Sequence, residues 1–255
     1  MITIEPLEVS RDSAVPVVTV HPAAPACPHR MLTIAQSDSG KSTVLQNLWV
    51  KVYKDFFQGR IFVFCPNADE VHVWLNLGVA KPQIFMNYKV EDVDRIIDLQ
   101  QKHVLRAGYE KKTPKQCLII LEDLTQSPLT RTRNSRFNTM LSNCRHYGIS
   151  VWASAQVYHT VERIARINFD NYVFFRIFNR DELTQIADDN AVDPKEFMKV
   201  YRYATEHRPF GFLYIKRSSR QGVQYFAHFC ETPIDQNDVE AWLSRSEQST
   251  STSSE

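Results

Sequence analysis

The sequence has 255 residues, of which 43% are hydrophobic, enough for the core of one large or two small globular domains. Lys and Arg number 30 against 29 Asp and Glu, so the chain could meet a polyanion only through local basic clusters. The five cysteines have no C-x-x-C spacing, which favours a reducing compartment and argues against structural zinc.

Neither end of the chain has the composition of a membrane or export segment. No apolar run approaches the roughly 20 residues that span a bilayer, and acidic side chains stand where a signal peptide has basic ones. We expect a protein that does not cross a membrane and is not secreted. Residues 1–29 are proline-rich around an alternating run, Val15 to Val20, which predicts an extended arm with an edge strand.

The stretch from Met31 to Asn47 reads MLTIAQSDSGKSTVLQN, an apolar run, a polar turn and the start of an amphipathic helix. This order predicts a phosphate-binding loop, because the strand delivers backbone N–H groups to phosphate oxygens and the helix aims its N-terminal dipole at them. Lys41 should reach the β- and γ-phosphates of ATP, and Ser42 should bind Mg²⁺, with Thr43 as the second hydroxyl candidate. The expected nucleotide-binding residues are Ala35, Gln36, Ser37, Asp38, Ser39, Gly40, Lys41, Ser42 and Thr43.

Two positions depart from the pattern G-x-x-x-x-G-K-[ST]. Ala35 replaces the first Gly, which is acceptable as long as its φ is negative. Asp38 brings a carboxylate next to the phosphates and should weaken binding unless Lys41, the metal or an outward rotamer separates the charges. The alternative to a phosphate loop is a polar turn in which Ser39 and Ser42 merely cap a helix.

Helical and strand patterns then alternate along the chain. A helix of about four turns should bury Val44, Leu45, Leu48, Trp49, Val52 and Phe56. It is followed by a strand from Arg60 to Cys65, a shorter one from Ile84 to Tyr88 and a helix from Val90 to about Leu105. The β-α-β order predicts a parallel sheet.

The segment from Cys117 to Asp123 reads CLIILED, a strand buried on both faces that ends in two carboxylates. Ligands of α/β sheets bind at the carboxyl ends of strands, so both acids should lie beside the phosphate loop. In a nucleotide hydrolase one such carboxylate holds Mg²⁺ through water and the other polarises the attacking water. We expect Glu122 to be the metal partner and Asp123 the base; because the usual order has Asp first, an exchange of roles stays open, as does an ordinary solvated strand end.

A strand from Ile149 to Ala155 ends in Gln156, whose amide could donate to the γ-phosphate and accept from the attacking water. Just upstream, a helix from about Ser135 ends near Arg145. This arginine is a candidate finger that stabilises the phosphoryl group bound by a neighbouring subunit. The alternative is a helix C-terminal charge with no further role.

Beyond this point the patterns predict more strands and helices and two basic clusters. The expected elements are a strand from Asn171 to Phe178, helices Asp181 to Asp189 and Pro194 to Glu206, and a hairpin of Phe210 to Lys216 with Val223 to Phe229. The clusters offer sequence-tolerant phosphate contacts to duplex DNA, unless both are simply solvated loops. Their members are Lys111, Lys112, Lys115, Arg131, Arg133 and Arg136.

The motifs AQSDSGKS, LIILED, NCRHYGISVWASAQ and ARINFDNYVFF together resemble the DNA-packaging ATPases of large DNA viruses and virophages. This is the poxvirus-type branch of the FtsK/HerA superfamily, and the resemblance runs from about Arg30 to Phe229. The family's sensor Gln corresponds to Gln156, and its Arg-His-Tyr-Gly segment to 145–148. Ala35, Asp38 and Glu122 stand where the family usually has Gly, Gly and Asp.

The resemblance implies a RecA-like core, a homo-oligomeric ring around duplex DNA, and translocation into a capsid driven by Mg²⁺-dependent ATP hydrolysis. It further implies a capsid or portal-vertex protein as partner and a location in the virion or in a viral factory of the host cytoplasm.

Taken together, the sequence predicts a three-layer α/β P-loop ATPase domain over 30–230, with a mostly parallel central sheet and an antiparallel edge extension. Residues 231–255 form a C-terminal segment whose Ser/Thr-rich tail, from Ser244, is expected to be disordered. Two alternatives to a DNA translocase remain. One is a RecA-like or AAA-like ATPase that acts on another polymer, and the other is a weakly hydrolysing or non-hydrolysing assembly scaffold, favoured by Asp38 and Glu122.

Overall fold

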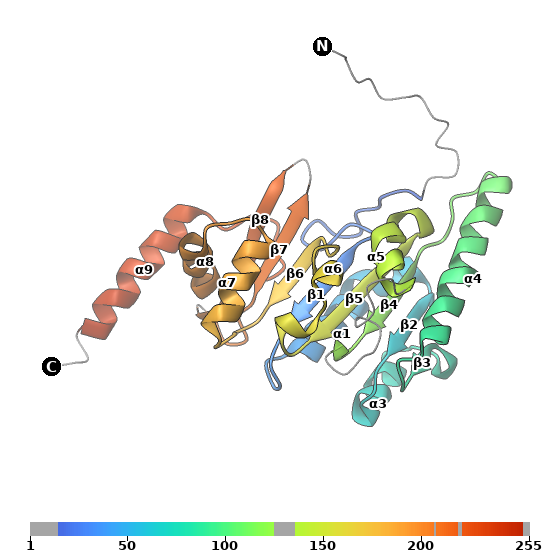
Figure 1. Cartoon of the computed structure of the whole chain (residues 1–255), viewed down its shortest axis with the longest axis horizontal. Coiled ribbons are helices and arrows are strands. Elements are labelled where there is room, and N and C mark those ends of the chain that lie inside the picture. The colour runs from blue at the N-terminus through green and yellow to red at the C-terminus, as the bar shows by residue number, and fades with distance from the viewer. Residues whose placement is uncertain (1–14, 125–135, 207, 219–220, 252–255) are drawn as a thin grey trace, which may run out of the picture.

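A computed structural model of the chain describes residues 15–124, 136–206, 208–218 and 221–251. These residues contain one eight-stranded sheet in the order β3-β2-β4-β5-β1-β6-β7-β8 (Figure 1). The strands from β3 to β6 in that order are parallel, and β7 and β8 are antiparallel to their neighbours. The predicted mostly parallel sheet with an antiparallel edge extension is therefore confirmed.

The strands are short apolar runs, because residues that are buried on both faces of a parallel sheet have no polar side to present. Leu32 at the centre of β1 lies opposite Ala153 of β5 on one side and Tyr172 of β6 on the other. The strands are β1 Arg30–Ile34, β2 Ile61–Phe64, β3 Ile84–Phe85, β4 Cys117–Leu121, β5 Ile149–Ala155, β6 Asn171–Phe174, β7 Leu213–Ser218 and β8 Gly222–Ala227.

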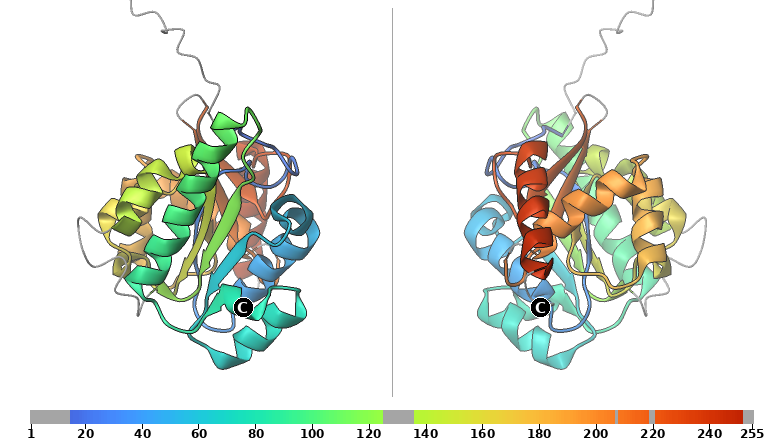
Figure 2. Two further views of the ribbon diagram at one scale, coloured as in Figure 1. Left: turned by 90° about the vertical axis from the view of Figure 1, so that its right-hand side faces the viewer. Right: turned by 90° about the vertical axis from the view of Figure 1, so that its left-hand side faces the viewer.

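Helices cover both faces of the sheet, as the end views in Figure 2 show. The helices on one face are α1 Lys41–Leu48, the π-helical segment η1 Trp49–Tyr53, α2 Lys54–Phe57 and α3 Ala68–Asn76. Those on the other face are α4 Val90–Tyr109, α5 Arg136–Tyr147, α6 Arg163–Arg166, α7 Arg180–Asp189 and α8 Pro194–Glu206. Single 3₁₀ turns occupy η2 Lys81–Gln83 and η5 Tyr158–Thr160, and α9 Gln236–Ser251 follows the hairpin.

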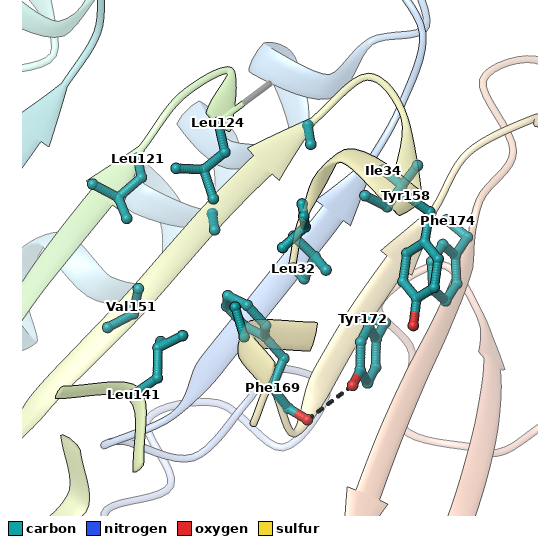
Figure 3. Packing of buried hydrophobic residues seen from close by; sticks show 14 of the residues in the cluster. Leu32, Ile34, Leu121, Leu124, Leu141, Val151, Tyr158, Phe169, Tyr172 and Phe174 are labelled. Atoms are coloured by element: carbon teal, nitrogen blue, oxygen red, sulfur yellow. Dashed lines mark hydrogen bonds between the residues drawn. The ribbon is translucent and has the colours of Figure 1, made fainter. Parts of the chain in front are cut away.

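Each face of the sheet buries its own hydrophobic cluster. Leu32 and Leu121 point to the face covered by α4 and α5, and Figure 3 shows them in one cluster with Leu124, Val151 and Phe169. In the same cluster the Tyr172 hydroxyl donates to the Phe169 carbonyl oxygen at 3.1 Å, so a buried polar atom is satisfied within the core. The two clusters and the sheet between them form the predicted three-layer architecture.

The first helix differs from its sequence prediction in register. The pattern predicts Val52 and Phe56 inward, and both are half-buried against the core, but Tyr53 and Phe57, which the pattern left out, are the fully buried residues. The reason is η1, because a π turn holds more residues than an α turn and rotates the following side chains around the axis. The expected four-turn helix exists, but its second half is rotated so that Tyr53 and Phe57 are buried most deeply.

The predictions for the two ends of the chain need correction. The run Val15 to Val20 is not a strand, since it makes a single antiparallel bridge between Val18 and Cys27, and its Pro16 cannot donate to a ladder. At the other end, α9 continues through Ser251, where we expected disorder from Ser244. Packing of Trp242 on Tyr203, with ring centroids 6.0 Å apart, holds the first half of α9, and the helix extends from it. None of the helices in the described ranges is long and apolar enough to span a membrane.

A buried histidine ties the arm to the sheet. His29 is only 2% exposed, and its Nε2 atom accepts a hydrogen bond of 2.7 Å from the Trp152 indole. Its backbone N–H donates to Ser150 Oγ at 3.3 Å. Burial lowers the pKa of His29 to about 4, although the charge of Asp170 and a backbone hydrogen bond oppose the shift. His29 is therefore neutral in the folded protein at neutral pH.

Stability should fall as the pH drops below the unfolded pKa of His29. The unfolded state takes up a proton near pH 6.5 and the folded state only near pH 4, so about 3 kcal/mol is lost across that window. Urea unfolding at several pH values from about 7 to 4 measures the loss. His29→Gln, which keeps an acceptor for Trp152, should show a shallower pH dependence than the unchanged protein. Parallel curves for the two proteins would contradict the assignment.

Candidate active site

The predicted phosphate loop connects β1 to α1 at the carboxyl end of the central strand. The Ala35 backbone N–H donates to the Ala155 carbonyl oxygen at 3.1 Å, and the φ of Ala35 is not positive, so an alanine fits there. Gly40 has a φ of 91°, which glycine adopts without strain, and it forms the N-cap of α1 without a side-chain hydrogen bond. The first N–H groups of α1 thus have no side-chain cap. This argues against the alternative, a polar turn in which serines cap the helix.

Asp38 and Ser39 shape the turn of the loop. Ser39 Oγ donates to the Gln36 carbonyl oxygen at 2.6 Å and closes the turn internally. Asp38 is exposed and has a φ of 60°, a left-handed conformation that glycine adopts more easily. A glycine would therefore fit the backbone of this position better than Asp does. Lys41, Ser42 and Thr43 follow in the first turn of α1.

Glu122 follows β4 and points to the α1 and α3 face of the sheet. It is 6% exposed, and both of its carboxylate oxygens accept hydrogen bonds. The Cys65 thiol donates to Oε2 at 3.1 Å, and the Trp74 indole donates to Oε1 at 3.2 Å. Burial raises the pKa of Glu122, while the hydrogen bond from Cys65 and the charge of Lys41 favour the carboxylate form.

Asp123 adopts a positive φ of 53° directly after Glu122. Its backbone N–H donates to Ser154 Oγ at 3.1 Å, which joins the ends of β4 and β5. Gln156 Nε2 donates to Asp123 Oδ2 at 3.4 Å, so the two predicted catalytic side chains touch. Asp123 Oδ1 is buried and has no hydrogen-bond partner among the described residues. A second carboxylate in a strained backbone beside an amide suits a base that must accept a proton.

These residues surround one cavity of about 530 Å³ at the carboxyl edge of the sheet. The loop, the two acids and Gln156 line it together, although they come from three strands that are far apart in sequence. Sequence analysis missed several of the residues around it, namely Cys65, Pro66, Asn67, Glu70, Trp74 and Phe210. The position of the first three directly after β2 could have indicated them, because all parallel strands end at this edge. No local signal marked Trp74 or Phe210.

The oxygen donors at this cavity fit Mg²⁺. Ser42, Glu122 and Asp123 line it together, and hydroxyl and carboxylate oxygens are the ligands that Mg²⁺ prefers. The buried and unpartnered Oδ1 of Asp123 is an acceptor that a metal-bound water would satisfy. Each oxygen of Glu122 accepts one protein donor and keeps a second lone pair for such a water.

Arg145 lies at the amino ends of the parallel strands, whereas the phosphate loop of its own chain lies at their carboxyl ends. It is near the end of α5, just before β5 begins, and its side chain is 61% exposed. Its Nη2 atom is 3.5 Å from Asp170 Oδ2, an oxygen that Arg30 binds more closely at 2.9 Å. Arg145 is therefore accessible and cannot serve the nucleotide of its own subunit.

The predicted DNA-contact residues also divide between the two edges. Lys111, Lys112 and Lys115 lie between α4 and β4, at the same edge as Arg145. Lys112 pairs with Glu110 at 3.0 Å, and Lys115 Nζ donates to Gln58 at 3.1 Å. Arg136 begins α5 near the phosphate-loop edge, whereas Arg131 and Arg133 lie outside the described residues. The two clusters therefore do not form one patch through their described members.

A family model with the description Poxvirus A32 protein matches residues 24–203. The chain belongs to the poxvirus A32 protein family. This confirms the family predicted from the loop and strand motifs. The matched region contains the phosphate loop, both acids, Arg145 and Gln156, which are all the residues assigned to the site from sequence. No curated protein sequence matches the chain in a direct comparison.

Solved structures similar to this A32-family chain share its fold. The genome packaging NTPase B204 of Sulfolobus turreted icosahedral virus 2, in complex with AMP, has a TM-score of 0.56 at 16% identity, covering 82% of this chain and 98% of that one. The DNA-packaging ATPase B204 of Sulfolobus turreted icosahedral virus has the same TM-score and identity, with coverages of 82% and 99%. The pCW3 conjugation coupling protein TcpA, with ATPγS, has a TM-score of 0.50 at 14% identity, covering 81% and 61%. The predicted P-loop ATPase fold is thus confirmed.

Replacing Asp38 by Gly should raise ATP affinity about fivefold, or about 1 kcal/mol, because a carboxylate beside the phosphates is removed. Gly also relieves the left-handed backbone at φ 60°, so the melting temperature should rise slightly. Titration calorimetry with MgATP measures the affinity. Asp38→Asn separates the two effects, since it removes the charge and keeps a side chain. Weaker binding by the Gly variant would mean that Asp38 holds the loop or the metal.

Proposed function

We propose that this chain is an ATP-driven DNA translocase that packages viral genomic DNA into a capsid. Membership of the poxvirus A32 family makes it a viral genome-packaging ATPase. The observation that carries the proposal is the convergence of the phosphate loop, Glu122, Asp123 and Gln156 on one cavity at the carboxyl edge of a parallel sheet. A site of this kind positions a triphosphate between a cationic loop and a pair of acids, as phosphoryl transfer requires.

Within the site each residue has a distinct task in hydrolysis. Lys41 and the N–H groups at the start of α1 hold the β- and γ-phosphates. Ser42 and Glu122 hold Mg²⁺, which when bound neutralises charge on those phosphates. Asp123 accepts a proton from the attacking water, and Gln156 orients it. The hydrogen bond of 3.4 Å between Gln156 and Asp123 supports this last pairing.

The edge opposite the phosphate loop faces a neighbouring subunit in the proposed ring. Arg145 is exposed there and is held only by a long ion pair of 3.5 Å with Asp170. A guanidinium in that position can release Asp170, reach across the interface and stabilise the γ-phosphate bound by the neighbouring subunit. Duplex DNA passes through the ring, gripped through phosphates by the lysines of 111–115 and the arginines of 131–136. A capsid or portal-vertex protein anchors the ring, and the protein acts in the virion or in the viral factory.

Duplex DNA should stimulate ATP hydrolysis at least several-fold at low salt, and the stimulation should decrease as salt rises because phosphate contacts are screened. Steady-state ATPase rates with and without DNA of random sequence measure this. The Lys41→Ala variant should lose turnover under all conditions, since the loop loses its cationic side chain. Nucleotide binding without turnover by the unchanged protein would favour an assembly scaffold. An ATPase rate that is the same with and without DNA would favour an ATPase that acts on another polymer.

Arg145→Ala protomers should bind ATP normally but hydrolyse it on the order of 10³ times more slowly. If neighbours share the site, mixing Arg145→Ala with Lys41→Ala protomers should restore activity, because one subunit supplies the loop and the next the arginine. ATPase rate against the mixing ratio is the measurement. Arg106→Ala, which removes another exposed arginine paired to a carboxylate, is the control and should not lower the DNA-free rate. A linear decline without complementation would indicate independent subunits.

A further inference from the structure

The acids fix which way a bound nucleotide lies across the sheet. Glu122 and Asp123 follow β4, two strands from β1 on one side, with β5 between them. The metal ion and the catalytic base act at the β- and γ-phosphates, so the triphosphate lies on the β4 side of β1. The ribose and base must therefore extend from the phosphate loop toward the other side of β1. There the sheet continues with β6 and β7.

The residue that lies there is Phe210, just before β7. It is 70% exposed, while the neighbouring aromatic rings of Phe175 and Phe212 are buried. A Cβ atom placed on Gly40 would be 3.5 Å from Phe210 Cδ1, so the ring lies directly against the phosphate loop. Phe210 lines the loop cavity and also an adjoining cavity of about 580 Å³, which Ser39, Arg176 and Arg208 line as well.

The backbone holds Phe210 in this exposed position. Its φ is 55°, a left-handed value that is unusual for a phenylalanine. The next residue, Gly211, is packed so tightly that a Cβ atom would be 2.7 Å from the Ala204 carbonyl oxygen and 2.8 Å from that of Thr205. The Gly211 N–H also donates to the Arg208 carbonyl oxygen at 3.1 Å. A bulky aromatic residue kept in a strained, solvent-facing conformation beside a ligand cavity suggests a ligand contact.

We propose that Phe210 is the nucleobase platform of this ATPase, on which the purine ring of the bound nucleoside triphosphate stacks. The inference rests on the proposed function, since it takes the triphosphate to be held by the phosphate loop. Stacking uses the face of the base and leaves its hydrogen-bonding edge unread. Phe210 therefore favours purines over pyrimidines, because of their larger face, and discriminates poorly between ATP and GTP.

Comparing a ligand that has a base with one that lacks it tests the platform. Titration calorimetry should be carried out with MgATP and with magnesium tripolyphosphate on the full chain. Phe210→Ala should weaken MgATP binding about tenfold and leave tripolyphosphate binding unchanged. Phe210→Tyr, which keeps the ring, should bind MgATP like the unchanged protein. Phe178→Ala removes another phenylalanine of nearly equal exposure, 69%, which follows β6, and should change neither affinity.

The outcomes separate this inference from the function on which it rests. If the unchanged protein binds neither ligand, the phosphate-loop assignment fails. If it binds both and Phe210→Ala binds MgATP as tightly as before, only the platform is overturned. An equal loss for both ligands would also overturn it, because Phe210 would then act by supporting the loop. Circular dichroism of Phe210→Ala checks that the fold is intact, and Phe210→Tyr gives an independent answer if it is not.

Discussion

The parallel pairing of β1 between β5 and β6 is the constraint on which the rest of this structure depends. Both faces of these strands are covered, so their side chains are apolar and their polar residues can appear only where the strands end. Because the strands are parallel, the ends of β1, β4 and β5 meet at one edge. The phosphate loop, the acid pair and Gln156 are neighbours for this reason, although Gln156 comes 121 residues after Ala35 in the chain.

Glu122 shows how the fold accommodates a long acidic side chain where the resemblance led us to expect an aspartate. A glutamate is one methylene longer than an aspartate, and at 6% exposure its charge needs partners. Cys65 from the end of β2 and Trp74 from α3 supply one donor to each oxygen, and Lys41 adds a favourable charge. Two elements on the same face of the sheet thus fix a side chain that would otherwise have freedom to rotate.

The carboxyl ends and the amino ends of the parallel strands, called here the carboxyl edge and the opposite edge, have different chemistry. The carboxyl edge holds the loop, the acids and the exposed ring of Phe210 around a continuous hollow. The opposite edge holds Arg30, Arg145 and Asp170, in an arrangement where one carboxylate serves two guanidinium groups. A ring of copies in which one edge of each subunit faces the other edge of the next would unite these features. Such a heterologous contact closes into a ring when the rotation between subunits permits.

The sequence by itself determined the succession of the strands, most of the helices between them, the phosphate loop and the residues at the ends of β4 and β5, but it did not indicate α3 or α6. Two-sided burial and loop chemistry are local properties, which a pattern of side chains records directly. Tertiary structure alone decided the register of the helix beyond Leu48, where a π turn buries Tyr53 and Phe57. It also decided the helix at the C-terminal end, the partners of Glu122 and the place of Phe210 beside Gly40. These depend on contacts between residues distant in the chain, and the packing energy of such contacts overrides local preference.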